Sequence, residues 1–359
     1  MPGRFDLAFE ELAALLPGEP PYRARQLWRG LHQGRAPEEI TELPAALRAR
    51  VAVELPAGLA LTRESVSDGG DTVKWLWALA DGAAVETVLM RYPQRTTVCL
   101  SSQAGCAMGC SFCATGQAGF TRNLSVGEIV EQVVRARREG ASNSAAAGGA
   151  SNSAAAGGVS NSAAAGGASN VVFMGMGEPM ANYGPVWSAV ERLHADVGFS
   201  ARHITISTVG VVPGIRRLAT EALPVNLAVS LHAANDGLRN ELVPLNRRYP
   251  LAQVMDACRV YLAAKHRRLS FEWALIGGVN DRPSDARELA TLVLPLRAHV
   301  NLIPLNPTPG YPARGTPAPG VRAFRDRLRE LGVNATVRRN RGTDIAAACG
   351  QLAATWRSA

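Results

Sequence analysis

The sequence predicts an α/β protein: a partial (β/α)6 barrel, preceded by an N-terminal helical accessory domain and a β-hairpin connector. After residue 95, six strand-like segments alternate with stretches of helical length, which is typical of a parallel sheet with right-handed crossovers. Three cysteines close to the end of the first of these segments indicate a metal or redox centre. The predicted domains are residues 1–58, 59–94 and 95–359, with a low-complexity insertion at 141–170.

Size and charge narrow the class of protein. A chain of 359 residues with 47% hydrophobic content can bury one large core and a smaller accessory domain. Neither a signal peptide nor a run of ~18 apolar residues is found, so we expect a cytoplasmic protein with no membrane partner. The net charge of +8 favours a polyanionic partner. An arginine-rich composition contributes to this charge, because Lys74 and Lys265 are the only lysines.

The first 94 residues predict helices and then a hairpin. Helical patterns cover residues 6–16, 22–32 and 44–53. Two β-rich runs, 73–79 and 84–91, flank Asp81-Gly82, which is a hairpin signal. Glu86 lies in the second run among apolar residues. Its carboxylate is either on a solvated edge or held for proton chemistry.

The barrel strands are predicted from six β-rich runs: 96–101, 170–174, 203–207, 225–231, 269–276 and 300–305. A further strand-like run covers 335–339, and a last helix is expected from Thr343. Between the first two strands, residues 141–167 repeat a nine-residue unit three times. The unit carries no charge and almost no bulky side chain, so we expect a flexible loop.

The cysteine motif is Cys106-x3-Cys110-x2-Cys113, on a loop that follows the first barrel strand. Three thiolates on one short loop can ligate three irons of a 4Fe-4S cluster and leave the fourth iron open to a small molecule. A structural zinc site would need a closed set of four ligands, and no second cysteine pair follows.

Polar residues recur where the predicted strands end, which is where barrel active sites are built. Gly175-Met-Gly177-Glu178-Pro179 ends the second strand, and its glycines allow a ligand to approach the backbone. Glu178 can accept hydrogen bonds from an ammonium group. The later strand ends carry Ser207, Ser230-Leu231-His232 and Asn306. Taken singly, each of these is an ordinary loop residue, and their shared position favours a common site.

The cysteine spacing, with Phe112 just before the third cysteine, resembles the radical S-adenosylmethionine superfamily. Longer motifs resemble one of its families, the RlmN dual-specificity RNA methyltransferases. They are residues 98–106, 173–179, 207–213, 230–232, 301–307 and 341–352. The similarity covers almost the whole chain and is weakest before Thr72.

The resemblance implies a radical S-adenosylmethionine barrel that methylates C2 of an adenine in 23S rRNA and in tRNA. It implies a 4Fe-4S cluster on Cys106, Cys110 and Cys113. Cys349 would carry the methyl group, Cys99 would release the product through a transient disulfide, and Glu86 would accept a proton. The implied S-adenosylmethionine contacts are Gly177, Glu178, Ser207, Ser230, Leu231, His232 and Asn306. An external donor of flavodoxin or ferredoxin type would supply electrons to a monomeric enzyme.

Two alternatives stay open at this point. A related methyltransferase, which confers antibiotic resistance, uses the same cysteines to modify adenine C8 of 23S rRNA. A non-catalytic iron-sulfur RNA-binding protein would explain the cluster loop, but it would give Glu86 and Cys349 no role.

Overall fold

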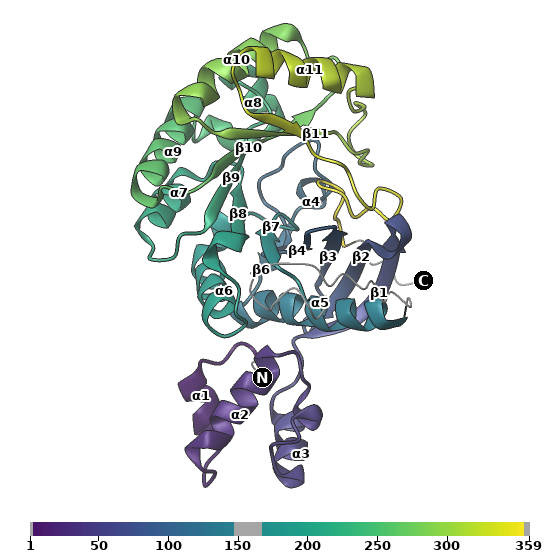
Figure 1. Ribbon diagram of the computed structural model, residues 1–359, viewed down its shortest axis with the longest axis vertical. Coiled ribbons are helices and arrows are strands. Elements are labelled where there is room, and N and C mark those ends of the chain that lie inside the picture. Colours follow the sequence, from purple (N-terminus) through teal and green to yellow (C-terminus); the bar gives the residue numbers. More distant parts are fainter. Residues whose placement is uncertain (1–2, 147–166, 355–359) are drawn as a thin grey trace, which may run out of the picture.

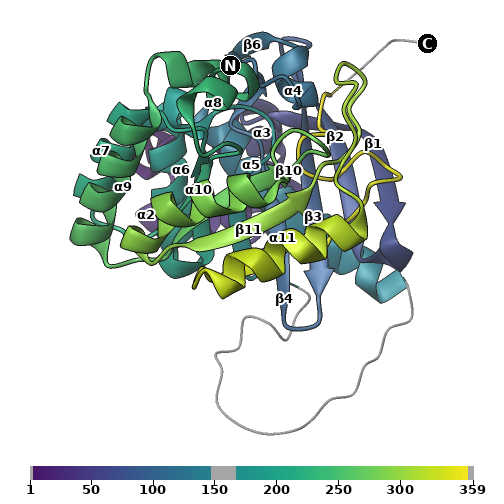
Figure 2. The same cartoon turned by 90° about the horizontal axis from the view of Figure 1, so that it is seen from above.

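The computed structural model describes residues 3–146 and 167–354, and its central feature is a ten-stranded sheet curved into an open barrel (Figures 1 and 2). The strand order is β1-β2-β3-β4-β7-β8-β9-β10-β11-β12, and a separate small sheet pairs β5 with β6. The strands are β1 (Leu59–Ser67), β2 (Thr72–Leu79), β3 (Ala84–Tyr92), β4 (Arg95–Cys99), β5 (Gln103–Gly105), β6 (Phe120–Asn123), β7 (Asn170–Phe173), β8 (Ile204–Thr208), β9 (Asn226–Ser230), β10 (Leu269–Leu275), β11 (His299–Pro304) and β12 (Ala335–Val337).

The parallel part of the sheet runs from β4 to β12, and all its neighbouring strands pair in parallel. This confirms the predicted α/β barrel and its six strands, and the run near residue 335 is β12. Every residue of β10 is buried, as expected for a parallel strand covered by helices. On its outer face the indole of Trp273 stacks on the ring of Phe324 in α11, with centroids 6.1 Å apart.

The antiparallel part of the sheet comprises β1 to β3, and β3 pairs with β4, so these strands continue the barrel sheet. The predicted hairpin of β2 and β3 is confirmed. Its turn is fixed by Asp81, whose Oδ1 accepts a hydrogen bond from the Ala83 N–H at 3.1 Å. Gly82 has φ +85°, a conformation that favours glycine. Strand β1 was not predicted, because most of its side chains are exposed and show no alternation of burial.

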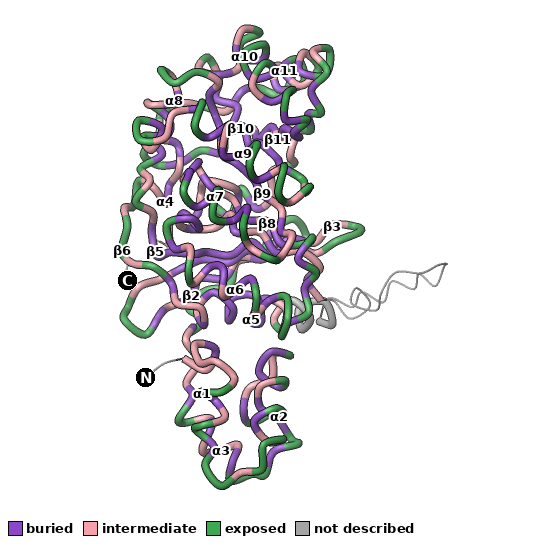
Figure 3. Tube along the Cα trace, turned by 90° about the vertical axis from the view of Figure 1, so that its left-hand side faces the viewer, coloured by how far each residue is buried: buried purple, intermediate pink, exposed green. Residues whose placement is uncertain are grey.

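Helices cover the outside of the sheet and form the N-terminal module that stands apart in Figures 1 and 3. The α-helices are α1 (Phe9–Ala14), α2 (Pro21–His32), α3 (Ala45–Glu54), α4 (Ala114–Gln117), α5 (Val126–Ala146), α6 (Tyr183–Ala195), α7 (Val212–Thr220), α8 (Asp236–Leu242), α9 (Leu251–Lys265), α10 (Pro283–Val293) and α11 (Ala318–Glu330). Short 3-10 helices are η1 (Pro37–Glu39), η2 (Asp68–Gly70), η3 (Pro179–Asn182), η4 (Ala201–His203), η5 (Pro244–Arg247) and η6 (Leu294–Leu296). No helix within the described ranges is long and apolar enough to span a membrane.

Polar contacts join the N-terminal module to the barrel helices. The indole N–H of Trp28 in α2 donates to Asp196 at the end of α6, at 2.8 Å. The Gly127 N–H, in the first turn of α5, donates to the Asp6 carboxylate at 2.9 Å. These contacts fix the module against α5 and α6, on the outside of the barrel (Figure 1).

Two predictions need correction. Residues 141–146, expected to be a loop, continue α5, and the rest of the repeat at 147–166 lies outside the described residues. The helix expected from Thr343 is wrong, because that segment forms a series of turns. Tertiary contacts replace a helical ladder there: the Gly342 N–H donates to Asp68, and the Asp344 carboxylate accepts from the Ser67 hydroxyl. Ala346 has φ +51°, which interrupts a right-handed helix.

Candidate active site

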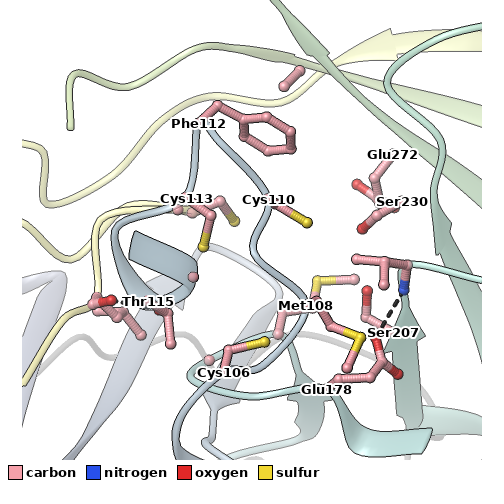
Figure 4. Close-up of a pocket in the computed structure, with 18 of the residues that line it drawn as sticks. Cys106, Met108, Cys110, Phe112, Cys113, Thr115, Glu178, Ser207, Ser230 and Glu272 are labelled. Atoms are coloured by element: carbon pink, nitrogen blue, oxygen red, sulfur yellow. Dashed lines mark hydrogen bonds between the residues drawn. The ribbon is translucent and has the colours of Figure 1, made fainter. Parts of the chain in front are cut away.

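The main cavity opens at the carboxyl ends of the parallel strands, between the cysteine loop and the C-terminal segment (Figure 4). Ten of the residues expected at the site line it: Cys106, Cys110, Cys113, Gly177, Glu178, Ser207, Ser230, His232, Asn306 and Cys349. Cys99 lines a second cavity, and Cys349 lines both. Leu231 and Glu86 line neither of these two cavities.

The cysteine loop lies between β5 and α4 and is anchored by backbone hydrogen bonds at three places. The Cys106 N–H donates to Gly119 O at 2.8 Å, the Ser111 N–H to Leu242 O at 3.3 Å, and the Ala114 N–H to Gly350 O at 2.7 Å. The last bond ties the loop to the segment that carries Cys349. All six cysteines of the chain are free thiols in this structure.

The loop thiols share one environment. Burial raises the pKa of Cys106 to about 12, and burial with the neighbouring thiols Cys113 and Cys106 raises the pKa of Cys110 well above its ordinary value. Figure 4 shows the three side chains around one space. Thiolates in such a site need positive charge to compensate them, and the irons of a cluster bound through one thiolate each would supply it. The donor set therefore fits an iron-sulfur cluster.

Gly177 and Glu178 form a tight turn after β7. Gly177 has φ +97°, and a Cβ there would lie 2.5 Å from Gln103 Cβ, so no other residue fits without a shift. The Glu178 carboxylate accepts from the Met180 N–H at 3.0 Å and the Val209 N–H at 2.9 Å. Burial nevertheless raises its pKa to about 7. A cationic ligand beside this carboxylate would favour its charged form.

The ends of β8 and β9 are held by a buried arginine in α8. Arg239, with 1% of its surface exposed, donates to Val209 O at 2.7 Å, Ser230 O at 3.1 Å and Leu231 O at 3.0 Å. Burial lowers the pKa of Arg239 to about 10, still above neutrality. The Leu231 carbonyl thus serves to position Arg239, and its side chain belongs to the core.

His232 lines the main cavity beside Phe112. Its ring lies edge to face against Phe112, with centroids 4.7 Å apart. Nδ1 accepts a hydrogen bond from the Ala274 N–H at 2.9 Å, so a neutral ring carries its proton on Nε2. Burial and then the charge of Arg239 lower the pKa of His232 to about 3, which keeps the imidazole neutral.

Cys349 lies where the two cavities meet. The Asn306 side-chain amide donates to Cys349 O at 3.1 Å and so positions this turn. Cys99, at the end of β4, lines the second cavity beside Arg338. Burial and then Cys349 raise the pKa of Cys99 to about 12, while the charge of Arg338 opposes the shift. Cys99 is therefore a protonated thiol at rest.

Glu86 anchors the C-terminal segment from β3. Its carboxylate is paired with Lys74 at 2.7 Å and accepts from the Ala353 N–H at 3.0 Å and the Ala354 N–H at 3.3 Å. Lys74 also donates to Ala346 O at 3.2 Å. Glu86 therefore holds the chain just after the turn that carries Cys349, and Lys74 holds the chain just before it.

Comparison with known proteins identifies the family, although no protein-family model matches the chain. A protein of Chloroflexus aurantiacus named probable dual-specificity RNA methyltransferase RlmN is 51% identical over 362 residues, which span 97% of this chain and 92% of that protein. A Parafrankia protein of the same name is 53% identical over 360 residues, spanning 97% and 91%. The chain belongs to the RlmN family. The crystal structure of a radical SAM methyltransferase from Sphaerobacter thermophilus superposes on this RlmN chain with a TM-score of 0.89 and 48% identity, covering 98% and 99% of the two chains.

Several cavity residues of this RlmN chain were not predicted from its sequence. Met174, Glu272 and Arg338 line the main cavity, and Arg239 supports its wall. Glu272 could have been recognised from the sequence, because a carboxylate within the apolar run of β10 needs a partner inside the barrel. Arg338 and Arg239 could not have been recognised, because nothing in the sequence distinguishes them from the many other arginines of the chain.

Proposed function

We propose that this chain uses S-adenosylmethionine to methylate C2 of a specific adenine in 23S rRNA and in tRNA, through a methylated Cys349. The observation that carries the proposal is the position of Cys349, which faces the cysteine loop in one cavity and Cys99 in the next. A non-catalytic RNA-binding protein would need no such pair of thiols. The names of the relatives favour RNA methylation by an RlmN enzyme over the C8 alternative.

Cys106, Cys110 and Cys113 would hold a 4Fe-4S cluster, with S-adenosylmethionine contacting Gly177, Glu178, Ser207, Ser230, Leu231, His232 and Asn306. Together the cluster and S-adenosylmethionine supply radical chemistry, which adenine C2 requires because it is electron-poor and lacks a readily removed proton. The neutral ring of His232 and the ring of Phe112 form an apolar, edge-to-face wall suited to a purine.

Cys349 and Cys99, the two cavity cysteines outside the cysteine loop, would carry the methyl group and release the product. Cys349 carries the methyl group as a thioether, and its sulfur becomes the link to adenine. Cys99 then loses its proton, helped by the charge of Arg338, and attacks the Cys349 sulfur. The new S–S bond forms as the C–S bond to the adduct breaks, and the electron pair stays on the carbon, which takes up a proton to give the methyl group. A dithiol reductant restores both thiols before the next turnover.

Glu86 would accept the C2 proton once the methylene carbon has bonded to C2, and the single electron then left on the ring would return to the cluster held by the loop cysteines. From β3, Glu86 contacts the backbone of residues 353 and 354 in the segment that carries Cys349, so movement of this segment would bring the adduct to the carboxylate. The ion pair with Lys74, at 2.7 Å, holds the carboxylate in place beside this segment.

The remaining proposals concern partners. The exposed Arg25 and Arg29 of α2 suit phosphate contacts and support RNA docking by residues 1–58. Residues 59–94 would connect this domain to the barrel at 95–359. We place the enzyme in the cytoplasm, as a monomer that receives electrons from a flavodoxin or ferredoxin.

Cysteine variants test this function. With Cys349→Ala no methyl group can be carried, so reconstituted enzyme should leave RNA unmethylated. With Cys99→Ala the adduct cannot be released, so protein crosslinked to RNA should accumulate on denaturing gels. Cys258→Ala is the matched control, because Cys258 is fully buried in α9 and lines neither cavity. Methylation by Cys349→Ala, or no crosslink with Cys99→Ala, would contradict the proposal.

A further inference from the structure

Glu272 is a buried carboxylate that the roles assigned above do not use. It lies in the middle of β10, has 3% of its surface exposed, and lines the main cavity. A carboxylate is costly to remove from water unless its oxygens find hydrogen-bond donors. The partners of each oxygen therefore show whether the side chain is structural or is held for a ligand.

The two oxygens of Glu272 differ. Oε1 accepts from the Asn301 side-chain amide at 2.8 Å and from the Ser270 hydroxyl at 3.1 Å. Oε2 is also buried but has no hydrogen-bond partner. One oxygen is thus held by Ser270 of the same strand and Asn301 of the neighbouring strand, and the other makes no hydrogen bond. A buried acceptor without a donor is rare in native proteins and indicates a missing group.

The surroundings of Oε2 indicate what that group is. Ser230 pairs with Glu272 across β9 and β10, and Figure 4 shows the two side chains next to each other at the cavity wall, away from the cysteine loop. Ser207 lies further along the wall towards Glu178. This wall therefore presents two hydroxyls and a carboxylate oxygen that makes no hydrogen bond, with the charge of Arg338 nearby. The same cavity also holds the rings of Phe112 and His232.

We propose that Glu272 accepts a hydrogen bond from a ribose hydroxyl of S-adenosylmethionine, with Ser230 beside it. This inference rests on the proposed function, which assigns the cavity to that cofactor. Of the cofactor's donors, the ammonium group belongs with Glu178 and the adenine with Phe112 and His232, so the ribose lies between them. Acidic side chains bind ribose hydroxyls in dinucleotide sites by the same chemistry.

Ligand analogues test the inference directly. Binding of S-adenosylhomocysteine and of its 2′-deoxy and 3′-deoxy analogues is measured by calorimetry on the anaerobic, cluster-reconstituted protein. Wild type should bind one deoxy analogue about 10- to 100-fold more weakly than the parent, as expected for loss of a hydrogen bond to a charged group. Glu272→Gln should weaken binding of the parent by about 10-fold and reduce the discrimination between parent and analogue.

The control variant is Glu131→Gln, which changes a buried glutamate in α5 that is bonded to the Gly58 N–H and lines neither cavity. Its affinities should equal those of wild type. Equal binding of the parent and both analogues by wild type overturns the inference, even if Glu272→Gln fails to fold. Unchanged binding of the parent by a folded Glu272→Gln also overturns the inference. None of these binding measurements uses RNA, so failure of the proposed methylation would be seen separately.

Discussion

The ion pair between Lys74 and Glu86 connects stability to activity in a way that can be measured. The two charged atoms are 2.7 Å apart, and the side chains are 13% and 7% exposed, so solvent screens them weakly. Removing one partner of a buried ion pair typically lowers the free energy of unfolding by about 3–5 kcal/mol. In Lys74→Met the Glu86 carboxylate keeps two backbone N–H donors, which should reduce the cost to about 2 kcal/mol.

The substitution should also disturb the active site, because Lys74 donates a hydrogen bond to Ala346 O in the segment that carries Cys349. We expect the melting temperature of Lys74→Met to fall by about 3 °C, because the entropy of unfolding of a chain of this size is large. RNA methylation should fall more than ten-fold, since Glu86 and Cys349 lose their common anchor. In Lys74→Arg, which retains the charge, the melting temperature and RNA methylation should both fall less.

A double-mutant cycle decides whether the pair itself is responsible. In Lys74→Met/Glu86→Gln no buried charge is left alone, so the double variant should be more stable than the sum of the two single losses predicts, by about 1 kcal/mol or more. Thermal unfolding of the four proteins measures this coupling. If the loss of unfolding free energy in the double variant equals the sum of the two single losses, the ion pair is not responsible and the reasoning is refuted.

Two further predictions concern the turn after β7. Because burial raises the pKa of Glu178 from 4.5 to about 7, the folded state binds more protons than the unfolded state between these values, and its contribution to stability is lost as pH rises from about 4.5 to 7. The stability difference between wild type and Glu178→Gln should therefore change by about 3 kcal/mol across that window, and a constant difference would argue against a buried, protonated carboxyl. Gly177→Ala should cost about 2–4 kcal/mol, because its Cβ would meet Gln103 in a left-handed conformation. Gly184→Ala in α6, where a Cβ meets nothing within 4 Å, should be neutral or stabilising, and equal effects in thermal unfolding would contradict this steric explanation.

The barrel could be predicted from sequence because its strands are apolar runs separated by helical periods. The same logic placed Gly177, Ser207 and Ser230 at one edge, since parallel strands end together. Turn chemistry located the hairpin at Asp81 and Gly82. These features are local, and each can be found within about ten residues of chain.

Features that depend on distant contacts were missed. The segment after Thr343 has helical composition, but hydrogen bonds to Asp68, Ser67 and Glu86 hold it in turns. Strand β1 is stabilised by pairing with β2, not by its own pattern. Arg239 and Arg338 could not be distinguished from other arginines, because their roles come from the carbonyls and thiols that the fold brings to them.

The central claim is that the chain methylates adenine at C2. The direct measurement uses protein reconstituted anaerobically, S-adenosylmethionine, a low-potential electron donor and unmodified 23S rRNA or tRNA. Nucleosides from the digested RNA are then separated, and the methylated atom is assigned by mass spectrometry against standards. We predict 2-methyladenosine from both RNA classes. Formation of 8-methyladenosine, or of no methylated adenosine by an active-cluster preparation, would contradict the claim.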